Sequence, residues 1–308
     1  MNSPNEHAER FTLLRPLLFT IAYEILGSAT ESDDVLQESY LRWAEVELSA
    51  VRDTKSYLAQ VVTRQALNVL RSRTRRREEY VGPWLPEPLL LAPDAAADVV
   101  LAESVSMGML ILLETLTPEE RAVFVLHEVF GFEHDEIAGA VGKSASAVRQ
   151  LAYRARGHVH ARRNRFGPVD TARTGELTDR FLNAAATGDL DGLLALLAPD
   201  VHWTTDSGGK AFAVRELLMT GATRVAVMLV TLMKAIHRLP DTRIEQVHCN
   251  SDPAVAIYRG ERLEAVVVLE FAGGKIINGY GIRNPDKLAA LGVTRVISRT
   301  AESPDARG

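Results

Sequence analysis

The sequence predicts a multidomain chain with two all-α domains, the second containing a helix-turn-helix, and a third domain of α+β type. Two breaks separate them: residues 82–93 carry four prolines, and residues 162–175 are polar with Gly, Pro and Thr. Before the second break apolar residues recur at helical steps, and after it short β-rich runs follow a helical start. The predicted boundaries are 10–80 and 101–162 for the helical domains, 81–100 and 163–175 for the linkers, and 176–298 for the α+β domain.

Composition places the chain among folded proteins without membrane spans. Its 308 residues are 46% hydrophobic, which suffices for two or three domains. The single cysteine, Cys249, cannot form an internal disulfide and argues for a reducing compartment. The longest apolar run, Val225–Met233, is far shorter than the ~20 residues of a membrane helix, and Met1–Arg10 lacks the apolar core of a signal peptide. We therefore expect a cytoplasmic protein with no membrane association, no metal and no cofactor.

Two basic stretches interrupt a chain whose net charge is only −5. The residues between Asp53 and Glu78 and those between Glu136 and Asp170 include no acid, and each stretch holds seven Lys or Arg. Clustered Lys and Arg displace counterions from phosphate backbones, which is the usual source of nucleic-acid affinity. One such stretch is equally compatible with a solvated helix face, but two, each on a helical module, favour a nucleic-acid partner.

The second helical domain has the pattern of a helix-turn-helix. Thr117-Pro118-Glu119-Glu120 is typical of a helix start, because threonine caps, proline fits the first turn and the second glutamate can complete a capping box. We expect this helix to reach about Phe130 and a short helix to follow over His134–Ala140. Gly142-Lys143-Ser144 then predicts a tight turn whose serine caps the last helix. This is the spacing of a DNA-binding helix-turn-helix.

The last helix sorts its residues onto two faces. One is an apolar stripe at helical spacing, formed by Val148, Leu151, Ala152 and Ala155. The other mixes hydroxyl, guanidinium and phenol groups, which suits the base edges and phosphates of a major groove. The alternative is a surface helix of an ordinary bundle. The DNA-binding residues that we predict in this domain are Ser144, Ser146, Arg149, Tyr153, Arg154 and Arg156.

At this point the residues resemble a known family. The segment TPEERAVFVLHEVFGFEHDEIAGAVGKSASAVRQLAYRARGHV is similar to region four of the extracytoplasmic-function sigma factors. Arg15–Val46, with GSATESDDVLQESYLRWAEV, is similar to their region two. The resemblance implies that region two binds the clamp of core RNA polymerase and opens the minus-ten promoter element. It implies that region four reads the minus-thirty-five element, so the implied partners are core RNA polymerase and promoter DNA.

The region-two segment carries two further candidate surfaces. On the helix after Thr30 the core positions are Leu36, Tyr40 and Trp43, and the resemblance places against the polymerase clamp Asp33, Asp34, Gln37 and Glu38. An acidic face is also an ordinary solvated face. The next helix, from Thr54 to about Arg73, has a core stripe of Leu58, Val61, Val62, Ala66 and Val69. Its opposite face matches the family's minus-ten contact, and the predicted DNA-binding residues there are Arg64, Asn68, Arg71, Arg75 and Arg76.

A narrower resemblance covers the linker and the C-terminal domain. Trp84-Leu85-Pro86-Glu87-Pro88 and Asn284-Pro285-Asp286-Lys287-Leu288 match signatures of the sigma factors with a fused SnoaL-like domain, the SigJ-like group. Asp206-Ser207-Gly208-Gly209-Lys210 is similar to a third, with Ser207 as a departure. The resemblance implies that these motifs dock on the sigma core and the linker and regulate activity without a separate anti-sigma protein. The implied regulatory residues are Trp84, Pro86, Glu87, Asp206, Gly208, Gly209, Lys210, Asn284, Pro285, Asp286 and Lys287.

The α+β domain resembles SnoaL-like domains, which fold as a cone with a pocket. We expect a helical start over Leu177–Leu197 and a hairpin turn at 272–274, with strands at Val201–Thr205, Ala254–Tyr258, Leu263–Phe271 and Lys275–Tyr280. Some relatives are polyketide cyclases or isomerases that use Asp and His as acid and base. The alternative function is therefore such an enzyme fused to a DNA-binding module, with a pocket lined by His202, Asp206, Lys210 and His248. We favour a regulatory domain that is not an enzyme, in which an unidentified small molecule bound in the pocket would act as a regulator.

Overall fold

The computed structural model describes residues 4–77, 80–92, 98–163, 171–210 and 218–300. Its contacts divide the chain into two compact units. The helical unit takes residues 1–78, 91–162 and 294–308, and the sheet unit takes residues 79–90 and 163–293. None of the helices in the described ranges combines the length and the apolar character needed to cross a lipid bilayer.

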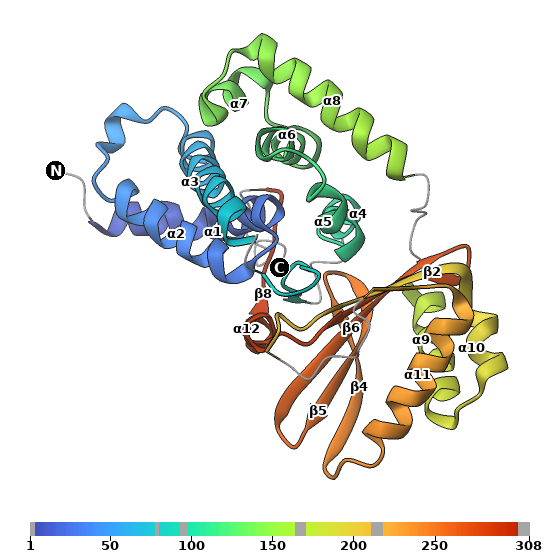
Figure 1. Cartoon of the computed structure of the whole chain (residues 1–308). Coiled ribbons are helices and arrows are strands. Elements are labelled where there is room, and N and C mark those ends of the chain that lie inside the picture. The colour runs from blue at the N-terminus through green and yellow to red at the C-terminus, as the bar shows by residue number, and fades with distance from the viewer. Residues whose placement is uncertain (1–3, 78–79, 93–97, 164–170, 211–217, 301–308) are drawn as a thin grey trace. The chain divides into compact units, whose positions relative to one another are not determined.

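The helical unit contains two successive sets of helices (Figure 1). The first set is α1 (Pro4–Leu26), α2 (Ala29–Trp43), the 3-10 turn η1 (Leu48–Ala50) and α3 (Thr54–Arg77). The second set is α4 (Val99–Ser104), α5 (Met107–Leu113), α6 (Pro118–Phe124), the π-helical turn η3 (Val125–Val129), α7 (His134–Val141) and α8 (Ala145–Arg163).

Helix α1 is the centre of this unit. Leu17, Leu18 and Ile21 are fully buried, and the helix packs against α2 and α3 on one side and against α6 and η3 on the other. Burying each such side chain stabilises the fold by roughly 1.5–3 kcal/mol. Because α1 contacts both sets of helices, its core residues join the two sets into one unit.

Several predicted features of this unit are confirmed and others need correction. Thr117 and Glu120 form the predicted capping box. The helix that they start is α-helical to Phe124 and π-helical from Val125 to Val129, so it ends close to the predicted Phe130. Helix α3 continues past Arg73 to Arg77, because no proline or glycine stops it. In the predicted core stripe of α3, Leu58, Val62 and Ala66 are buried, whereas Val61 and Val69 are only half-buried. The buried stripe instead takes in Ala59, Thr63 and Leu67.

The C-terminal segment from Thr294 to Thr300 packs against the helical unit, although the polar sequence after Ser298 suggests a frayed tail; residues 301–308 lie outside the described residues. The Ser298 N–H donates to Thr20 Oγ1 at 3.1 Å, and Arg299 Nε pairs with Asp98 Oδ2 at 2.6 Å. Ile297 is only 4% exposed. An apolar anchor flanked by hydrogen bonds holds this otherwise polar segment in place. We call residues 294–300 the C-terminal strap.

The sheet unit is of α+β type, as predicted. Its helices are α9 (Thr171–Thr187), α10 (Leu190–Leu196), α11 (Ala222–Ile236) and α12 (Pro285–Leu288), with the 3-10 turn η4 (Ala289–Gly292). Its strands are β2 (Leu197–Asp206), β3 (Leu218–Thr220), β4 (Thr242–Cys249), β5 (Asp252–Arg259), β6 (Arg262–Ala272) and β7 (Lys275–Ile282). They lie in the order β3-β2-β7-β6-β5-β4, and all neighbours are antiparallel except β2 and β7.

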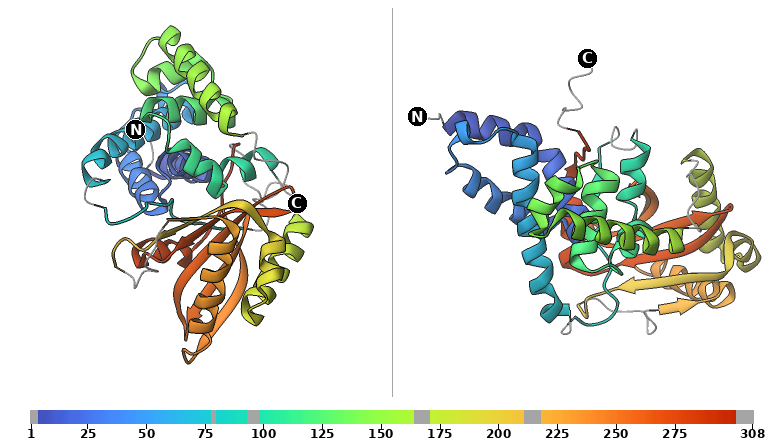
Figure 2. Two further views of the ribbon diagram at one scale, coloured as in Figure 1. Left: turned by 45° about the vertical axis from the view of Figure 1, so that its right-hand side comes forward. Right: turned by 90° about the horizontal axis from the view of Figure 1, so that it is seen from above.

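Helices α9, α10 and α11 cover one face of this sheet and form its core (Figures 1 and 2). Phe181, Leu193 and Val225 from the helices pack with Trp203 and Leu269 from the strands. Gly279 of β7 lies directly under the Trp203 ring, where a Cβ would collide with it. The curved sheet and its helices therefore enclose a core with a cavity on the same side.

The four predicted strands are present, but strands β3 and β4 and helices α11 and α12 of the sheet unit were not predicted. Strand β4 was missed because its residues are mostly polar, with Arg243 and Glu245 paired on its surface at 3.1 Å. Strand β3 has only three residues. Helix α11 contains the apolar run that we considered only as a membrane segment, and its buried residues recur at helical spacing. Helix α9 begins at Thr171, within the segment predicted as a linker.

Candidate polymerase and nucleic-acid interface

The helix-turn-helix has the predicted local geometry. Helix α7 ends at Gly142, whose φ of 69° lies in the left-handed region that favours glycine. Ser144 Oγ then accepts a hydrogen bond from the Ala147 N–H at 3.3 Å, which confirms the predicted N-cap of α8. Because both helix ends are fixed by these residues, α8 leaves the turn in a defined direction along the outside of the unit (Figure 1).

Helix α8 separates a buried and an exposed face as predicted. All four residues of the apolar stripe are buried, with Val148 and Ala155 fully so. On the other side Ser146 and Arg149 are exposed, and Tyr153 is 79% exposed. An aromatic side chain that projects so far into solvent contributes little to the fold. The exposed face is therefore available to a groove of DNA.

The arginines of this face differ in whether they have an acidic partner. Within the described part of the chain Arg149 has no acidic partner, whereas Arg154 Nε pairs with Glu120 at 2.9 Å and Arg156 Nη2 with Glu128 at 2.5 Å. Burial alone raises the pKa of Glu120, but hydrogen bonds from Arg154 and Thr117 outweigh it and hold that pKa below its usual value. Glu120 therefore stays ionised and fixes the Arg154 guanidinium.

The predicted DNA-binding face of α3 is engaged inside the helical unit. Arg64 donates from Nε at 3.2 Å and from Nη2 at 2.6 Å to the carbonyl of Gly139 in α7. Arg71 pairs with Glu119 at 2.8 Å. The hydrogen bond from Arg71 and its positive charge lower the pKa of Glu119. Asn68 is exposed. The backbone of Arg75 and Arg76 continues α3, but their side chains lie outside the described residues.

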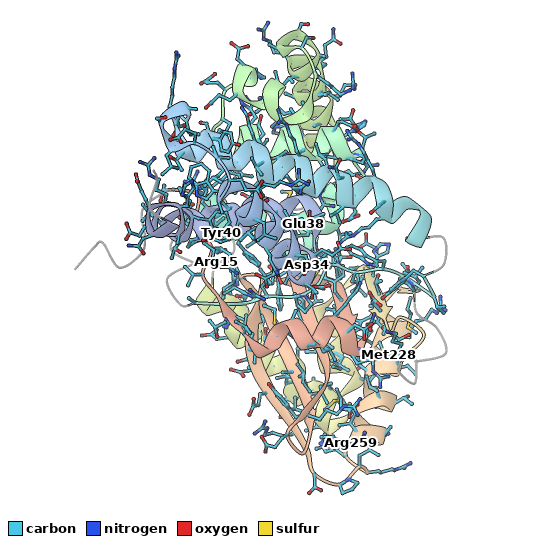
Figure 3. All side chains as sticks on the ribbon, turned by 90° about the vertical axis from the view of Figure 1, so that its left-hand side faces the viewer. Arg15, Asp34, Glu38, Tyr40, Met228 and Arg259 are labelled. Carbon is cyan, nitrogen blue, oxygen red and sulfur yellow. The ribbon has the colours of Figure 1, made fainter. Side chains whose placement is uncertain are left out.

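The acidic face of α2 lies on the surface of the helical unit. Asp34, Gln37 and Glu38 are exposed, and Glu38 Oε2 accepts a hydrogen bond from Gln65 at 2.8 Å (Figure 3). Asp33 is different, because two arginines hold it. Arg15 donates to its Oδ1 at 3.1 Å, and Arg295 of the C-terminal strap pairs with its Oδ2 at 2.7 Å. One of the four predicted polymerase contacts is therefore occupied by the chain's own C-terminal strap.

In the sheet unit the predicted regulatory motifs converge on Asp206. This residue ends β2 and is fully buried. Its Oδ1 accepts from the Tyr80 hydroxyl at 2.5 Å, and its Oδ2 accepts from the Leu85 N–H at 2.9 Å and from Lys287 Nζ at 2.7 Å. Burial and the carboxylate of Asp206 raise the pKa of Tyr80 well above its ordinary value, so the hydroxyl stays a donor.

Lys287 completes this cluster from α12. Its side chain is 6% exposed, and Nζ donates both to Asp206 and to the Leu85 carbonyl. The ammonium also lies 4.1 Å from the centre of the Trp84 ring and 5.1 Å from that of Tyr80. A buried ammonium needs such partners, since removing one of two buried ions costs about 3–5 kcal/mol. We call the described residues 80–90 the linker segment, and Asp206 and Lys287 hold it in the sheet unit.

The remaining motif residues surround this pair. Asn284 caps α12 through the Asp286 N–H at 3.1 Å and donates to the Tyr80 hydroxyl at 3.0 Å. Gly208 has φ +56°, and a Cβ there would come within 2.5 Å of Asn284 Nδ2. Gly209 has φ +69° and faces Val81. Pro285 is the first residue of α12, Lys210 and Asp286 form an exposed ion pair, Pro86 is buried and Glu87 is half-buried.

The glycines after Asp206 suggest a flexible loop, and Asn284-Pro285 suggests a turn that presents Asp286 and Lys287, but the structure differs at both places. Asp206 does not lie on an exposed flexible loop, because it is the last residue of a strand with all its oxygens bonded. Asn284-Pro285 does not form a turn that presents Lys287 to solvent. It starts a helix whose third residue, Lys287, points into the cluster, because an asparagine cap and a proline at the first position favour a helix.

The residues proposed for an enzymatic pocket do not come together. The cavity of the sheet unit is lined by Lys210 but not by His202, Asp206 or His248. His202 and His248 are both exposed on strands, and Asp206 is committed to the linker segment. Strand alternation explains His202, because its neighbour Trp203 takes the inward position. The expected acid and base pair is thus absent from the described cavity wall.

Some residues of these clusters were not predicted. Tyr80 precedes the proline-rich motif and carries no signal of its own. Asn250 exchanges two hydrogen bonds with Leu89, through its Oδ1 at 2.8 Å and its N–H at 3.0 Å. Asn250 and Ser251 both have positive φ, the geometry of a tight hairpin turn between β4 and β5. Beside this turn Leu90 of the short strand β1 (Leu90–Leu91) pairs with Cys249. Arg295 lay in a segment without any recognisable motif.

Comparison with known proteins is consistent with this architecture. Models of Sigma-70 region 2, Sigma-70 region 4 and a SnoaL-like domain match residues 11–76, 109–159 and 178–278. ECF RNA polymerase sigma factor SigJ of Mycobacterium tuberculosis is 37% identical over 90% of this chain and 91% of its own length. The "Probable ECF RNA polymerase sigma factor SigI" of that organism is 31% identical over 90% and 93%. The crystal structure of SigJ covers 92% of this chain and 98% of its own, with a TM-score of 0.73 at 31% identity. The chain therefore belongs to the ECF RNA polymerase sigma factors, with a SnoaL-like domain at its C-terminal side.

Proposed function

We propose that this protein binds core RNA polymerase and directs promoter-specific initiation of transcription. The observation that carries the proposal is the α8 face, where Arg149 and Tyr153 project into solvent from a helix whose other face is buried. Guanidinium and phenol groups on an exposed helix suit base edges and phosphates in a major groove. Asp34, Gln37 and Glu38 supply the acidic surface for the polymerase clamp.

The second DNA contact of the proposal is α3, and it must be released before it can act. Two of the five N–H donors of Arg64 bond the Gly139 carbonyl, which directs the guanidinium toward α7 rather than toward a phosphate. Hydrogen bonds to a charged group contribute about 1.5–3 kcal/mol each, a cost that polymerase and promoter together can offset. The helical unit in this arrangement is thus a resting form, and engagement separates α3 from α7.

The C-terminal region is proposed to regulate this step. Asp206 and Lys287 bind the linker segment, which connects the two sigma regions in the sequence. The C-terminal strap binds Asp33 through Arg295. Both contacts compete with the arrangement needed on polymerase. Catalysis by the SnoaL-like domain is the less favoured alternative, because His202 and His248 lie outside the cavity. The comparisons give no support to action without a separate anti-sigma protein.

Run-off transcription with purified core polymerase tests the function. The intact protein should direct core polymerase to start at a promoter fragment selected from genomic DNA, whereas core polymerase alone should not. Paired variants Asp34→Ala and Glu38→Ala should weaken binding to core polymerase, because both carboxylates are exposed. The exposed Glu45→Gln serves as the matched control. Promoter binding without polymerase, combined with no initiation, would instead indicate a repressor.

A further inference from the structure

Glu120 joins two helices of the helix-turn-helix domain through its two carboxylate oxygens. Its Oε2 accepts from the Thr117 hydroxyl at 2.9 Å and from the Thr117 N–H at 3.3 Å, which is part of the capping box of α6. Its Oε1 accepts from Arg154 Nε of α8 at 2.9 Å. Glu120 is only 5% exposed, so water hardly competes for either oxygen. One carboxylate therefore fixes both the start of α6 and the guanidinium of Arg154.

Arg154 keeps most of its donors for other acceptors. A guanidinium carries five N–H groups, and Glu120 accepts only from the one on Nε. Among the residues that the structure describes, no acceptor is bonded to Nη1 or Nη2 of Arg154. The side chain of Arg154 is 54% exposed. The ion pair thus holds the Nε side of the guanidinium and leaves the four N–H groups of the Nη side to a further acceptor.

The position of Arg154 on α8 indicates what this acceptor is. Arg149, Gln150, Tyr153 and Arg154 line one shallow depression on the surface of α8, so Arg154 lies beside the residues that we expect to contact bases. The planar N–H groups of an arginine match the oxygens of a phosphate with paired hydrogen bonds. Phosphates border the groove that a recognition helix enters, and contacts to them fix the register of the helix on the duplex.

We propose that Glu120 is a positioning residue for promoter recognition, which holds the Arg154 guanidinium for a phosphate of the DNA backbone. The inference rests on the DNA-binding role of α8 proposed above. An arginine that is already held loses less conformational freedom when it meets the phosphate, so the contact is tighter. A phosphate contact carries no base preference of its own, and the effect of Glu120 is therefore the same on every promoter sequence.

Glu120→Gln separates the capping role from the positioning role. The amide oxygen of glutamine can still accept from Thr117, because glutamine also completes a capping box. The amide NH₂ then faces Arg154 Nε, and two donors cannot bond each other. The variant should therefore keep the start of α6 and release Arg154. The lost order of one side chain should weaken promoter binding about two- to tenfold.

Two control variants separate this effect from charge and from stability. Removal of an acid near DNA would by itself strengthen binding, so a pure charge effect has the opposite sign. Asp135→Asn, at an exposed residue of α7, makes the same change of charge and should bind the promoter at least as tightly as the wild type. Ser106→Ala removes the N-cap of α5 and should lower the unfolding temperature without changing promoter affinity.

Fluorescence anisotropy of the polymerase-bound full chain on a promoter fragment, over a series of salt concentrations, measures these effects. Arg154→Ala should reduce the slope of log affinity against log salt concentration by about one, the value for one lost phosphate contact. In the Arg154→Ala background, Glu120→Gln should no longer weaken binding, because no arginine remains to be positioned.

Four results would overturn the proposal: an unchanged salt slope in Arg154→Ala, binding by Glu120→Gln as tight as wild type, a loss in Glu120→Gln that persists without Arg154, or the same loss in Ser106→Ala. Arg149→Ala separates this inference from the proposed function. If Arg149→Ala weakens promoter binding and Glu120→Gln does not, only the positioning role of Glu120 is wrong. A wild-type complex that does not bind the promoter would contradict the proposed function itself.

Discussion

Helices α8 and α3 carry the two basic stretches of the sequence, yet the structure holds their charges in opposite ways. Arg149 on α8 projects into solvent without an acidic partner among the described residues. Arg64 on α3 donates two of its five N–H groups to the Gly139 carbonyl, and Arg71 pairs with Glu119. Arg149 and Tyr153 on α8 are therefore open to solvent, although Arg154 and Arg156 pair with Glu120 and Glu128, whereas both Arg64 and Arg71 on α3 are engaged within the same unit.

This difference shows that a basic face needs more than its own residues to become a binding surface. The apolar stripe of α8 buries the helix on one side and leaves the other side uncovered. Helix α3 packs instead between α1 and the second set of helices, so α6 and α7 cover part of its polar side. If α3 contacts DNA as proposed, the contact between the two sets of helices has to open before α3 becomes available.

The largest expected effect concerns Glu24, which lies fully buried in that contact. Its Oε1 accepts from Ser104 of α4 at 2.7 Å, and Arg121 donates to its backbone carbonyl at 2.9 Å. Burial raises the pKa of Glu24 to about 8, against opposing effects of Ser104, Arg121 and Arg299. The pKa of Glu24 is higher in the folded chain than in the unfolded chain, so the protonated carboxyl contributes to stability. This contribution is fully present below about pH 4.5 and is lost as the pH rises through about 8.

Hydrogen exchange of α1 and α4 between pH 5 and 8.5, corrected for intrinsic rates, measures this loss. In the wild type, the free energy of opening derived from the exchange rates should fall by several kcal/mol between pH 5 and 8.5, since each unit of pKa shift corresponds to about 1.4 kcal/mol. Glu24→Gln should remove this dependence, because the amide cannot ionise but still accepts from Ser104. The exposed Glu45→Gln should retain it. An unchanged pH dependence in Glu24→Gln would show that Glu24 does not control the contact.

The next effect concerns the open face of α8. Arg149→Ala should cost the polymerase-bound protein about 1–3 kcal/mol in promoter affinity if the side chain makes a bidentate contact to a base. Arg154→Ala is the matched comparison on the same helix. Because Glu120 already fixes Arg154, we expect a phosphate contact, hence a weaker loss that is uniform across sequences. Fluorescence anisotropy at fixed salt measures both, and equal affinity in wild type and Arg149→Ala would remove Arg149 from the reading face.

Much of this comparison was accessible from the sequence, because local rules determine it. The capping box at Thr117, the left-handed Gly142 and the Ser144 cap each depend on a few neighbouring residues. The apolar stripe of α8 follows from helical spacing alone. The motif around Asp206 could be located, but its burial could not, since that depends on a lysine 81 residues further along the chain.

What the sequence could not predict are the long-range pairs. Arg64 looks the same whether its partner is a phosphate or the Gly139 carbonyl, because both accept from a guanidinium. The ion pair between Arg295 and Asp33 links residues that are far apart in the sequence, and no motif near either residue predicts it. The residues of strand β4 are mostly polar, so the sequence alone does not distinguish it from a loop, and only its pairing with β5 identifies it as a strand. Such features depend on tertiary packing rather than on periodicity or turn chemistry.

The smallest expected effect tests the contact between α3 and α7 without touching a predicted DNA-binding residue. Ser56 Oγ donates to Glu136 Oε1 at 2.6 Å across the two helices. Ser56→Ala removes this bond and the side-chain interaction of Ser56 with Asp53, while the backbone N–H of residue 56 stays bonded to Asp53 Oδ2 at 3.1 Å. The loss should be about 0.5–1.5 kcal/mol. It should appear as faster hydrogen exchange in α7.

Ser49→Ala, which removes an exposed bond to Glu47 within η1 and its flank, is the matched control and should leave α7 unchanged. If the occupied face of α3 limits engagement, Ser56→Ala should also raise the rate at which polymerase-bound protein opens a promoter, since Arg64 is freed more readily. An α7 that exchanges faster with no gain in promoter opening would mean that α3 is already released before the promoter is met. The difference between the two helices would then belong to the free protein alone.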